Sequence, residues 1–253
     1  MLLLRSKQTQ GLKWTFRAKP IRLLTLRQAY PMTVPDSSSM IVARYVNKLI
    51  SEDDFSNEIW QECERIRIEH YWSGEAAMPS RHAEARICWS GEAIHVRFVC
   101  RQQEALVVAE NPSTDKKTLG LWDRDVCEIF LAPDPENPWR YFEFEAAPTG
   151  EWVDLRITVK PSGRETDWDF ASGFTTAAKL DRDQLFVGMK IPWSEAIPKP
   201  ERGEVWRVNV FRCVGPEAPD RYLAWRPTRT EEPNFHVPEA FGWLRFGNTD
   251  EHG

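Results

Sequence analysis

Carboxylates in alternating runs are the residues of this 253-residue chain whose type and spacing could do chemistry. Glu143 and Glu145 alternate with phenylalanines, Glu128 lies in an apolar run before them, and Asp154 follows. Two carboxyl groups can hydrolyse a glycosidic bond when one is an acid with a raised pKa and the other an ordinary carboxylate. The four residues therefore leave a glycoside hydrolase open, although nothing in the sequence designates the acid.

Tryptophan is the second unusual feature, because the chain has 12 Trp and only 5 Tyr. The indole N–H needs a partner when it is buried, so this many tryptophans either pack large cores or stack on a ligand. Interfaces are also enriched in tryptophan, which leaves a protein-interaction domain as a further alternative. Composition alone does not choose among these.

The sequence contains no motif for disulfide, zinc or histidine-dependent metal chemistry. The five cysteines form no C-x-x-C pair, and the histidines show no H-x-x-x-H or H-E-x-x-H spacing. The sequence therefore predicts no disulfide framework and no zinc site. Cysteines in apolar alternating runs behave as small hydrophobes, which fits a reducing compartment better than an oxidising one. The sequence therefore indicates a cytoplasmic location or leaves the location open.

The net charge and the hydropathy of the chain limit the classes of partner that it can be expected to bind. The formal net charge is −5, which argues against a nucleic-acid partner. No apolar run approaches the roughly 18 residues that a transmembrane helix needs, and no signal peptide is evident. We therefore expect neither nucleic acid nor membrane as a partner, and the sequence leaves the oligomeric state open.

The chain divides at about residue 40. Residues 1–39 carry seven Lys or Arg and one acid, Asp36. This segment is interpreted as a basic N-terminal extension, either disordered or explained by a start codon assigned too far upstream, with Met32 or Met40 as the true beginning. Residues 40–249 contain no internal repeat and no Gly/Ser linker, so they are expected to form a single β-sandwich domain.

Period-2 alternation of apolar residues predicts strands along this domain, with turns between them. The segment Phe142–Ile157, with Pro148-Thr149-Gly150 at its centre, predicts a hairpin. Short helices are expected only at 51–57 and 194–196. Eight or more strands without a βαβ rhythm predict an all-β fold, an antiparallel β-sandwich with jelly-roll or immunoglobulin-like layering and short helical connections.

The hairpin presents one apolar face and one mixed face. We expect Glu143 and Glu145 on the mixed face, together with Trp152, Asp154 and Arg156. Arg156 could then neutralise two of the carboxylates and leave a polar, partly shielded platform, with Trp152 as a further wall. The alternative is the solvated face of an ordinary sandwich.

An ordered series of segments resembles carbohydrate-binding module family 9, in particular its stand-alone "family 9-like" branch, from about residue 48 to 247. The first segment, 121–131, reads W-x-x-D-x-x-E-[IV]-F. The others are 141–145, 148–152, 191–193, 206–212, 224–228, 235–238 and 241–244.

The resemblance implies a β-sandwich that holds a sugar, or the end of a glycan chain, between two tryptophans without catalysis, in the service of polysaccharide catabolism. Trp122 matches the first tryptophan, Trp225 stands where the second is expected, and Glu128 matches a hydroxyl-reading carboxylate. On a strand, residues six apart face the same side, so Trp122 and Glu128 could act together. The implied partner is a mono-, oligo- or polysaccharide.

The chain also departs from the family. Sugar-binding members carry basic and amide side chains where this chain has Glu143 and Glu145. Arg156 and Asn209 could supply the missing donors. A structural salt bridge from Glu128 to Arg156 or Arg212 is the alternative to a ligand role.

Calcium is bound structurally in some members of the family. Asp123, Asp125, Asp134 and Glu136 supply oxygen atoms here, but no loop has the regular ligand spacing of a dedicated site. No cofactor is therefore expected. His236, before Val237-Pro238, is interpreted as a residue that fixes a loop.

Overall fold

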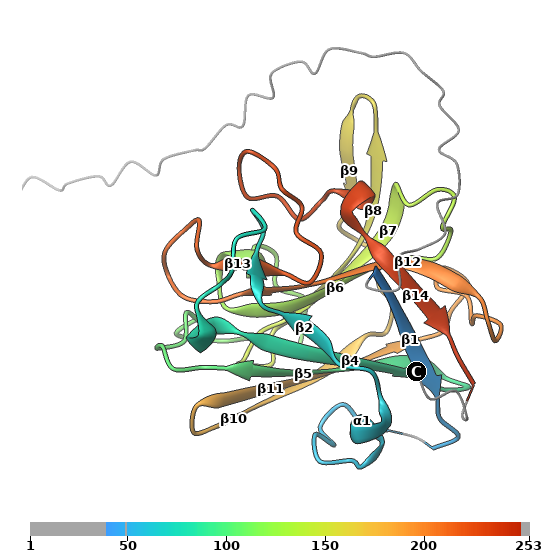
Figure 1. Ribbon diagram of the computed structural model, residues 1–253, viewed down its shortest axis with the longest axis horizontal. Coiled ribbons are helices and arrows are strands. Elements are labelled where there is room, and N and C mark those ends of the chain that lie inside the picture. Colours follow the sequence, from blue (N-terminus) through green and yellow to red (C-terminus); the bar gives the residue numbers. More distant parts are fainter. Residues whose placement is uncertain (1–38, 49, 249–253) are drawn as a thin grey trace, which may run out of the picture. The chain divides into compact units, whose positions relative to one another are not determined.

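The strands of this computed structural model form two layers (Figure 1). The structure describes residues 39–48 and 50–248. The first layer runs in the order β14 (Gly242–Phe246), β12 (Val205–Cys213), β6 (Val126–Ala132), β7 (Arg140–Ala146), β8 (Trp152–Lys160) and β9 (Gly163–Asp167). Beside β12, β13 (Tyr222–Ala224) pairs with β3 (His70–Tyr71). All these pairings are antiparallel.

The second layer runs in the order β10 (Thr175–Asp181), β11 (Gln184–Pro192), β5 (Ala93–Arg101) and β4 (Ala83–Trp89), with β2 (Ile66–Ile68) paired to β4. β1 (Met40–Tyr45) joins the two layers, because its first half pairs with β14 and its second half with β4. Both of these pairings are parallel. The all-β sandwich is confirmed, and β1 makes its sheet a mixed one.

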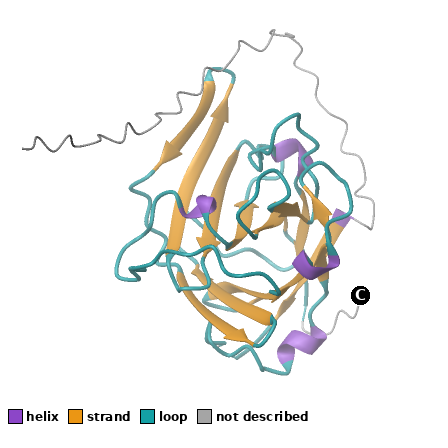
Figure 2. Ribbon diagram, turned by 90° about the vertical axis from the view of Figure 1, so that its left-hand side faces the viewer, coloured by secondary structure: helices purple, strands orange, loops and turns teal. Residues whose placement is uncertain are grey.

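Helical structure is confined to short pieces around the strands (Figure 2). These are α1 (Ile59–Glu62) and the 3₁₀ turns η2 (Pro79–Arg81), η3 (Leu121–Asp123) and η4 (Pro238–Ala240). Within the described residues, no helix has the length and apolar character needed to cross a membrane.

The two helices predicted from sequence are wrong in position. Residues 51–57 form turns, in which Asn57 Nδ2 donates to Asp54 Oδ2 at 2.8 Å and α1 starts only afterwards. At 194–197 the Ser194 hydroxyl accepts the backbone N–H of Ile197 at 3.1 Å. Short polar side chains that bond the local backbone compete with helix formation, and the periodicity of apolar residues does not reveal this.

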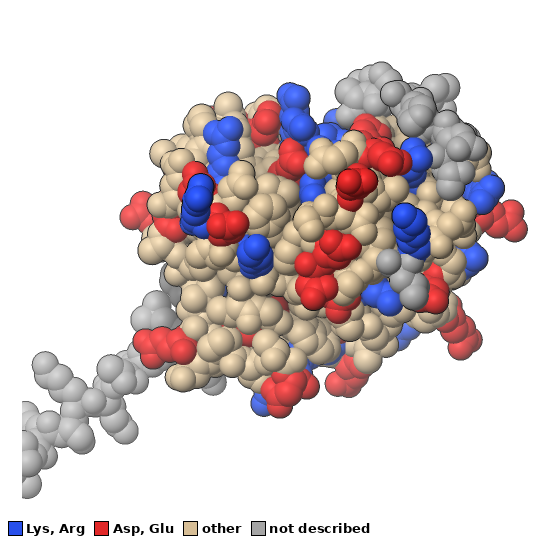
Figure 3. Space-filling model, turned by 90° about the horizontal axis from the view of Figure 1, so that it is seen from below, with Lys and Arg blue, Asp and Glu red and all other residues tan. Residues whose placement is uncertain are grey.

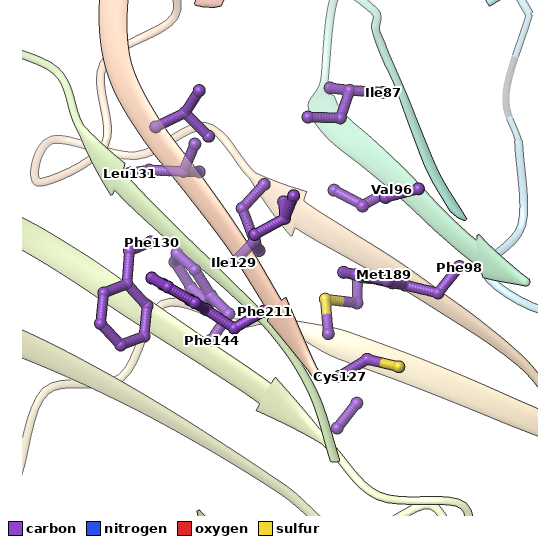
Figure 4. Packing of buried hydrophobic residues seen from close by; sticks show 14 of the residues in the cluster. Ile87, Val96, Phe98, Cys127, Ile129, Phe130, Leu131, Phe144, Met189 and Phe211 are labelled. Atoms are coloured by element: carbon purple, nitrogen blue, oxygen red, sulfur yellow. The ribbon is translucent and has the colours of Figure 1, made fainter. Parts of the chain in front are cut away.

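The hydrophobic core lies between the layers. Cys127, Ile129 and Leu131 of β6 point toward Val96, Phe98 and Met189 of the second layer (Figure 4). The Sγ atoms of Cys100 and Cys127 lie 3.5 Å apart across this core, and all five cysteines are free and buried. The other face of β6, which carries Glu128, therefore turns away from the second layer.

The predicted hairpin is present as β7 and β8, but its predicted mixed face is wrong. Glu143 lies opposite Leu155 and Glu145 opposite Val153, whereas Arg156 lies opposite Phe142. Residues directly opposite each other share a face, so the two glutamates face the opposite way from Arg156. The five-residue connection between Ala146 and Trp152 sets this register, and a loop one residue longer or shorter would reverse it.

Trp152, Asp154 and Arg156 therefore serve other contacts. Arg156 pairs with Asp167 of β9, and the Trp152 ring lies 6.2 Å from the ring of Phe174. Asp154 pairs with Lys117 Nζ at 2.8 Å. None of the three can neutralise or extend the Glu143–Glu145 pair.

The face of the molecule shown in Figure 3 has no dominant sign of charge. On the face shown in Figure 3, acidic and basic side chains are interspersed, as the near balance of 33 basic and 38 acidic residues predicts.

Candidate functional site

Three glutamates meet on the outer face of the first layer. Strand register places Glu128 of β6 opposite Glu145 of β7, and Glu143 one pair further along the same face. One carboxylate oxygen of each lies within 4.8 Å of one from the other two. Their residues are only 1%, 3% and 0% exposed for Glu128, Glu143 and Glu145. We call Glu128, Glu143 and Glu145 the glutamate cluster.

Hydrogen bonding in the cluster is incomplete. Cys213 Sγ donates to Glu128 Oε1 at 3.3 Å. Apart from a proton that Glu143 and Glu145 can share between their carboxyl groups, Glu143 Oε2 and both carboxylate oxygens of Glu145 are buried without a hydrogen-bond partner among the described residues. A buried polar atom without a partner is costly, so such a group calls for an explanation such as a proton or a bound molecule.

Burial is the main influence on the protonation of the cluster. It raises the pKa of Glu128 to about 8, and the charge of Glu143 adds to the effect. Burial also raises the pKa of Glu143 and, with the charges of Glu128 and Glu143, that of Glu145. Three carboxyls this close cannot all ionise cheaply, so the cluster holds protons at neutral pH.

Arg221 is a buried cation that acts on the glutamate cluster and that sequence analysis missed. Its side chain is buried, its Nη1 donates to the carbonyl oxygen of Asp123 at 2.9 Å, and its charge lowers the pKa of Glu128. Its Nε and Nη2 have no partner among the described residues. Arg221 lies in the loop before β13, where no alternation marks the face that a side chain joins.

Tyr141 and His236 lie beside Glu143. The Tyr141 hydroxyl and His236 Nδ1 are 2.8 Å apart, and the same nitrogen lies 3.9 Å from Glu143 Oε2. Burial and the charge of Arg164 lower the pKa of His236, so its ring is neutral at neutral pH. The ring thereby holds the 233–237 segment to the sheet, in the loop-fixing role expected from sequence.

Trp122 lies in the turn η3 rather than on a strand, so the predicted parity with Glu128 does not apply. Its ring lies 6.3 Å from that of Trp168, at an interplanar angle of 41°, and Trp168 is 43% exposed. The negative charge of the adjacent Asp123 raises the pKa of Glu145. The turn η3 contacts β7, so Trp122 lies in a segment beside the strand that carries Glu143 and Glu145.

Trp225 follows β13 and packs on β14. A Cβ atom added to Gly242 would lie 2.4 Å from Trp225 Cη2, so only glycine allows this contact. The Arg226 guanidinium lies 5.8 Å from the centre of the Trp225 ring. Among the described residues, no ring contact joins Trp225 to Trp122.

Asn209 and Arg212 bind neighbouring chain segments. Asn209 Nδ2 donates to the carbonyl oxygen of Arg226 at 2.9 Å, and its Oδ1 accepts the backbone N–H of Arg226 at 3.1 Å. Arg212 Nη2 donates to Gln102 Oε1 at 2.6 Å, on the face that points to the second layer. The alternative to a ligand role, a salt bridge from Glu128 to Arg156 or Arg212, is therefore wrong.

Comparison with family models gives a match to the carbohydrate family 9 binding domain-like family over residues 53–248. The match spans most of the chain. The protein belongs to this family. Comparison with curated proteins found no match.

Solved structures share the fold of this family 9-like protein. A Bacteroides uniformis protein proposed to bind carbohydrate has a TM-score of 0.64 at 19% identity, covering 82% of this chain and 99% of its own. A Caldicellulosiruptor kristjanssonii family 9 module in complex with cellotriose has a TM-score of 0.55 at 18% identity, covering 83% and 94%. The same organism's family 9 module with glucose has a TM-score of 0.55 at 19% identity, covering 85% and 99%.

The acids that the sequence offered to calcium do not gather in this family 9-like domain. Asp125 Oδ1 accepts the backbone N–H of Gly215 at 2.8 Å, and Asp134 Oδ1 accepts that of Glu136 at 3.0 Å. Within 39–48 and 50–248, the glutamate cluster is the only close group of three or more metal-ligating side chains. Asp123, Asp125, Asp134 and Glu136 therefore do not fit a shared calcium ion.

Proposed function

We propose that the protein binds a saccharide without catalysis, on the outer face of the first layer at the glutamate cluster. The observation that carries the proposal is the set of unmade hydrogen bonds there. Glu143 and Glu145 keep acceptor oxygens to which no other described residue donates, and Arg221 has N–H donors that no described residue accepts. A sugar hydroxyl both donates and accepts, so neighbouring hydroxyls can bond a carboxyl group and a guanidinium together.

Tryptophan supplies the apolar part of the proposed contact. The C–H face of a pyranose ring packs on a flat indole, which adds dispersion and apolar burial to the polar bonds. Trp122, in the turn beside β7 and next to the exposed Trp168, is the proposed platform. Trp225 as a second wall stays a prediction, as do Arg156 and Asn209 as replacement donors.

The three glutamates of the cluster are buried, so ligand binding requires a conformational change. Their oxygens can reach a ligand only if the segment that carries His236 moves away from Glu143. The Tyr141–His236 hydrogen bond is the contact that such a movement would break. Binding is therefore proposed to include a local opening of this segment.

The ligand class follows from the family. The related modules in complex with cellotriose and glucose make β-linked glucose units the first ligands to test. A place in polysaccharide catabolism and a cytoplasmic location belong to the same proposal, and neither is needed for the binding site itself.

Binding is favoured over hydrolysis by the protonation of the cluster. A hydrolytic pair needs one carboxylate with an ordinary pKa, and burial raises the pKa of Glu128, Glu143 and Glu145 alike. Asp154, the fourth candidate, faces the other way and pairs with Lys117. No member of the set is left as an ordinary nucleophile or base.

The test is calorimetric titration with glucose, xylose, cellobiose and cellotriose, together with intrinsic tryptophan fluorescence, on the whole chain. We expect saturable binding that Trp122→Ala weakens about tenfold or more, because the stacking surface is lost. Trp139→Ala is the matched control, since Trp139 is also partly exposed but precedes β7 at its other end. Its affinity should equal that of the wild type.

Other outcomes would overturn the proposal. Release of reducing ends that disappears in Glu128→Gln would make the protein a hydrolase. The absence of binding across a broad glycan array, together with loss of self-association in Trp122→Ala, would make it an interaction domain. Repeating the titration with EDTA separates direct binding from binding through a divalent cation.

A further inference from the structure

A second polar site lies at the other end of β12, away from the glutamate cluster. A cavity of about 300 Å³ opens where β12 and β14 meet the segment that follows β13. We call it the arginine pocket. Its main lining residues are Arg207, Arg226, Arg229, Glu239, Phe241 and Trp243.

The charges around the arginine pocket are unbalanced. Three guanidinium groups line it, against the single carboxylate of Glu239. Ion pairs among the described residues involve none of Arg207, Arg226 and Arg229. Like charges held close in a partly desolvated hollow repel each other, and an anion between them would relieve this repulsion.

Arg207 is held in place by its surroundings. Its Nε donates to the carbonyl oxygens of Phe241 and Gly242 at 3.2 and 3.1 Å, and its guanidinium lies 4.4 Å from the centre of the Trp243 ring. Burial and the nearby charge of Arg226 lower the pKa of Arg207. Arg207 and Arg226 line the same cavity, so both can reach one ligand there.

The other two arginines are also positioned by the fold. Both backbone groups of Arg226 are bonded to the buried amide of Asn209. The guanidinium of Arg229 packs against Gly74, where a Cβ atom would lie 2.5 Å from Arg229 Nη1. Neither side chain donates a hydrogen bond to another described residue, so both keep their donors for a ligand.

We propose that the arginine pocket binds an oxyanion, namely the carboxylate, phosphate or sulfate group of a molecule no larger than a monosaccharide. The planar guanidinium fork matches the paired oxygens of such groups. The volume lies at the lower end of the range for small-molecule sites.

The experiment titrates the whole chain with inorganic phosphate, sulfate and glucuronate, with glucose as the uncharged match, at constant ionic strength in a buffer without oxyanions. At least one oxyanion should bind saturably. Arg226→Gln and Arg229→Gln should each weaken it about tenfold, since a charge-assisted hydrogen bond is lost. Arg202→Gln, an exposed arginine over Tyr45 and outside the pocket, should leave it unchanged.

The relative affinities for glucuronate, phosphate and sulfate also identify the source of the oxyanion. Tighter binding of glucuronate than of phosphate or sulfate points to an acidic sugar, and the reverse order points to a free anion. The absence of saturable binding, or equal losses in Arg226→Gln and Arg202→Gln, would overturn the proposal. Trp122→Ala should not change anion affinity, because Trp122 is outside the pocket. A loss in that variant would place the anion at the glutamate cluster instead.

Discussion

Replacing Glu128 by glutamine should change the pH dependence of stability. Burial raises the pKa of Glu128 from 4.5 to about 8. Between these pH values the unfolded chain has lost a proton that the folded protein still holds. Stability therefore falls as pH rises through this window and levels off above pH 8, and below pH 4.5 the penalty is absent.

The size of the effect follows from the same two values. At about 1.36 kcal/mol for each pH unit, the difference between pH 4.5 and about 8 corresponds to about 5 kcal/mol. This is of the order of the whole unfolding free energy of a small domain. Glu128→Gln keeps the shape of the side chain and removes both its titration and the charge that raises the pKa of Glu145.

Urea unfolding followed by tryptophan fluorescence from pH 4.5 to 9 measures this effect. The variant should be more stable than the wild type at pH 9, by up to about 5 kcal/mol, and close to it at pH 4.5. Glu165→Gln is the control, because Glu165 is an exposed glutamate of β9 whose side chain is 61% accessible. It should follow the wild-type curve.

Two results would refute the reasoning. A wild-type stability that stays constant between pH 5 and 8 would mean that the glutamate cluster is not buried in the folded protein in solution. A Glu128→Gln curve parallel to the wild-type curve would mean that the pH dependence arises from other groups.

Two stability predictions concern packing and charge elsewhere. Gly188→Ala should cost about 3 kcal/mol or prevent folding, because its Cβ would lie 1.8 Å from the carbonyl oxygen of Glu52. Gly91→Ala, whose nearest contact would be 3.9 Å away, should change Tm little, and equal losses would contradict the clash. Lys117→Met should cost about 3–5 kcal/mol in urea unfolding at pH 7, because it leaves the buried Asp154 unpaired. A loss below about 1 kcal/mol would mean that this pair contributes little.

Much of the fold could be predicted from local pattern. Alternation of apolar residues marked strands such as β5, β8 and β11, and the Pro-Thr-Gly segment marked the hairpin between β7 and β8. These signals are local, because side chains in a strand alternate between faces whatever the partner strand is. The ordered segments also indicated the family, whose model matches residues 53–248.

The candidate site could be predicted only in part. Glu128, Glu143 and Glu145 were singled out from sequence, and the register of β6 and β7 brings them together. Arg156 was predicted beside them, but the loop length of the hairpin turns it to the other face. Trp122 was predicted on a strand, but it lies in a turn. A shift of strand register by one residue, or a turn in place of a strand, moves a side chain to the other face of the sheet. The periodicity of the sequence contains information about neither.

The sequence by itself determined the strands, the all-β class and the residues with reactive or stacking side chains, because these depend on residue type and on period-2 alternation. Only the tertiary structure decided which of them meet. Arg221 approaches Glu128 from a loop, and Arg207 and Arg226 meet across β12 and the segment after β13. Such meetings depend on strand pairing between distant segments, and on burial that changes the charge of each group once the chain has folded.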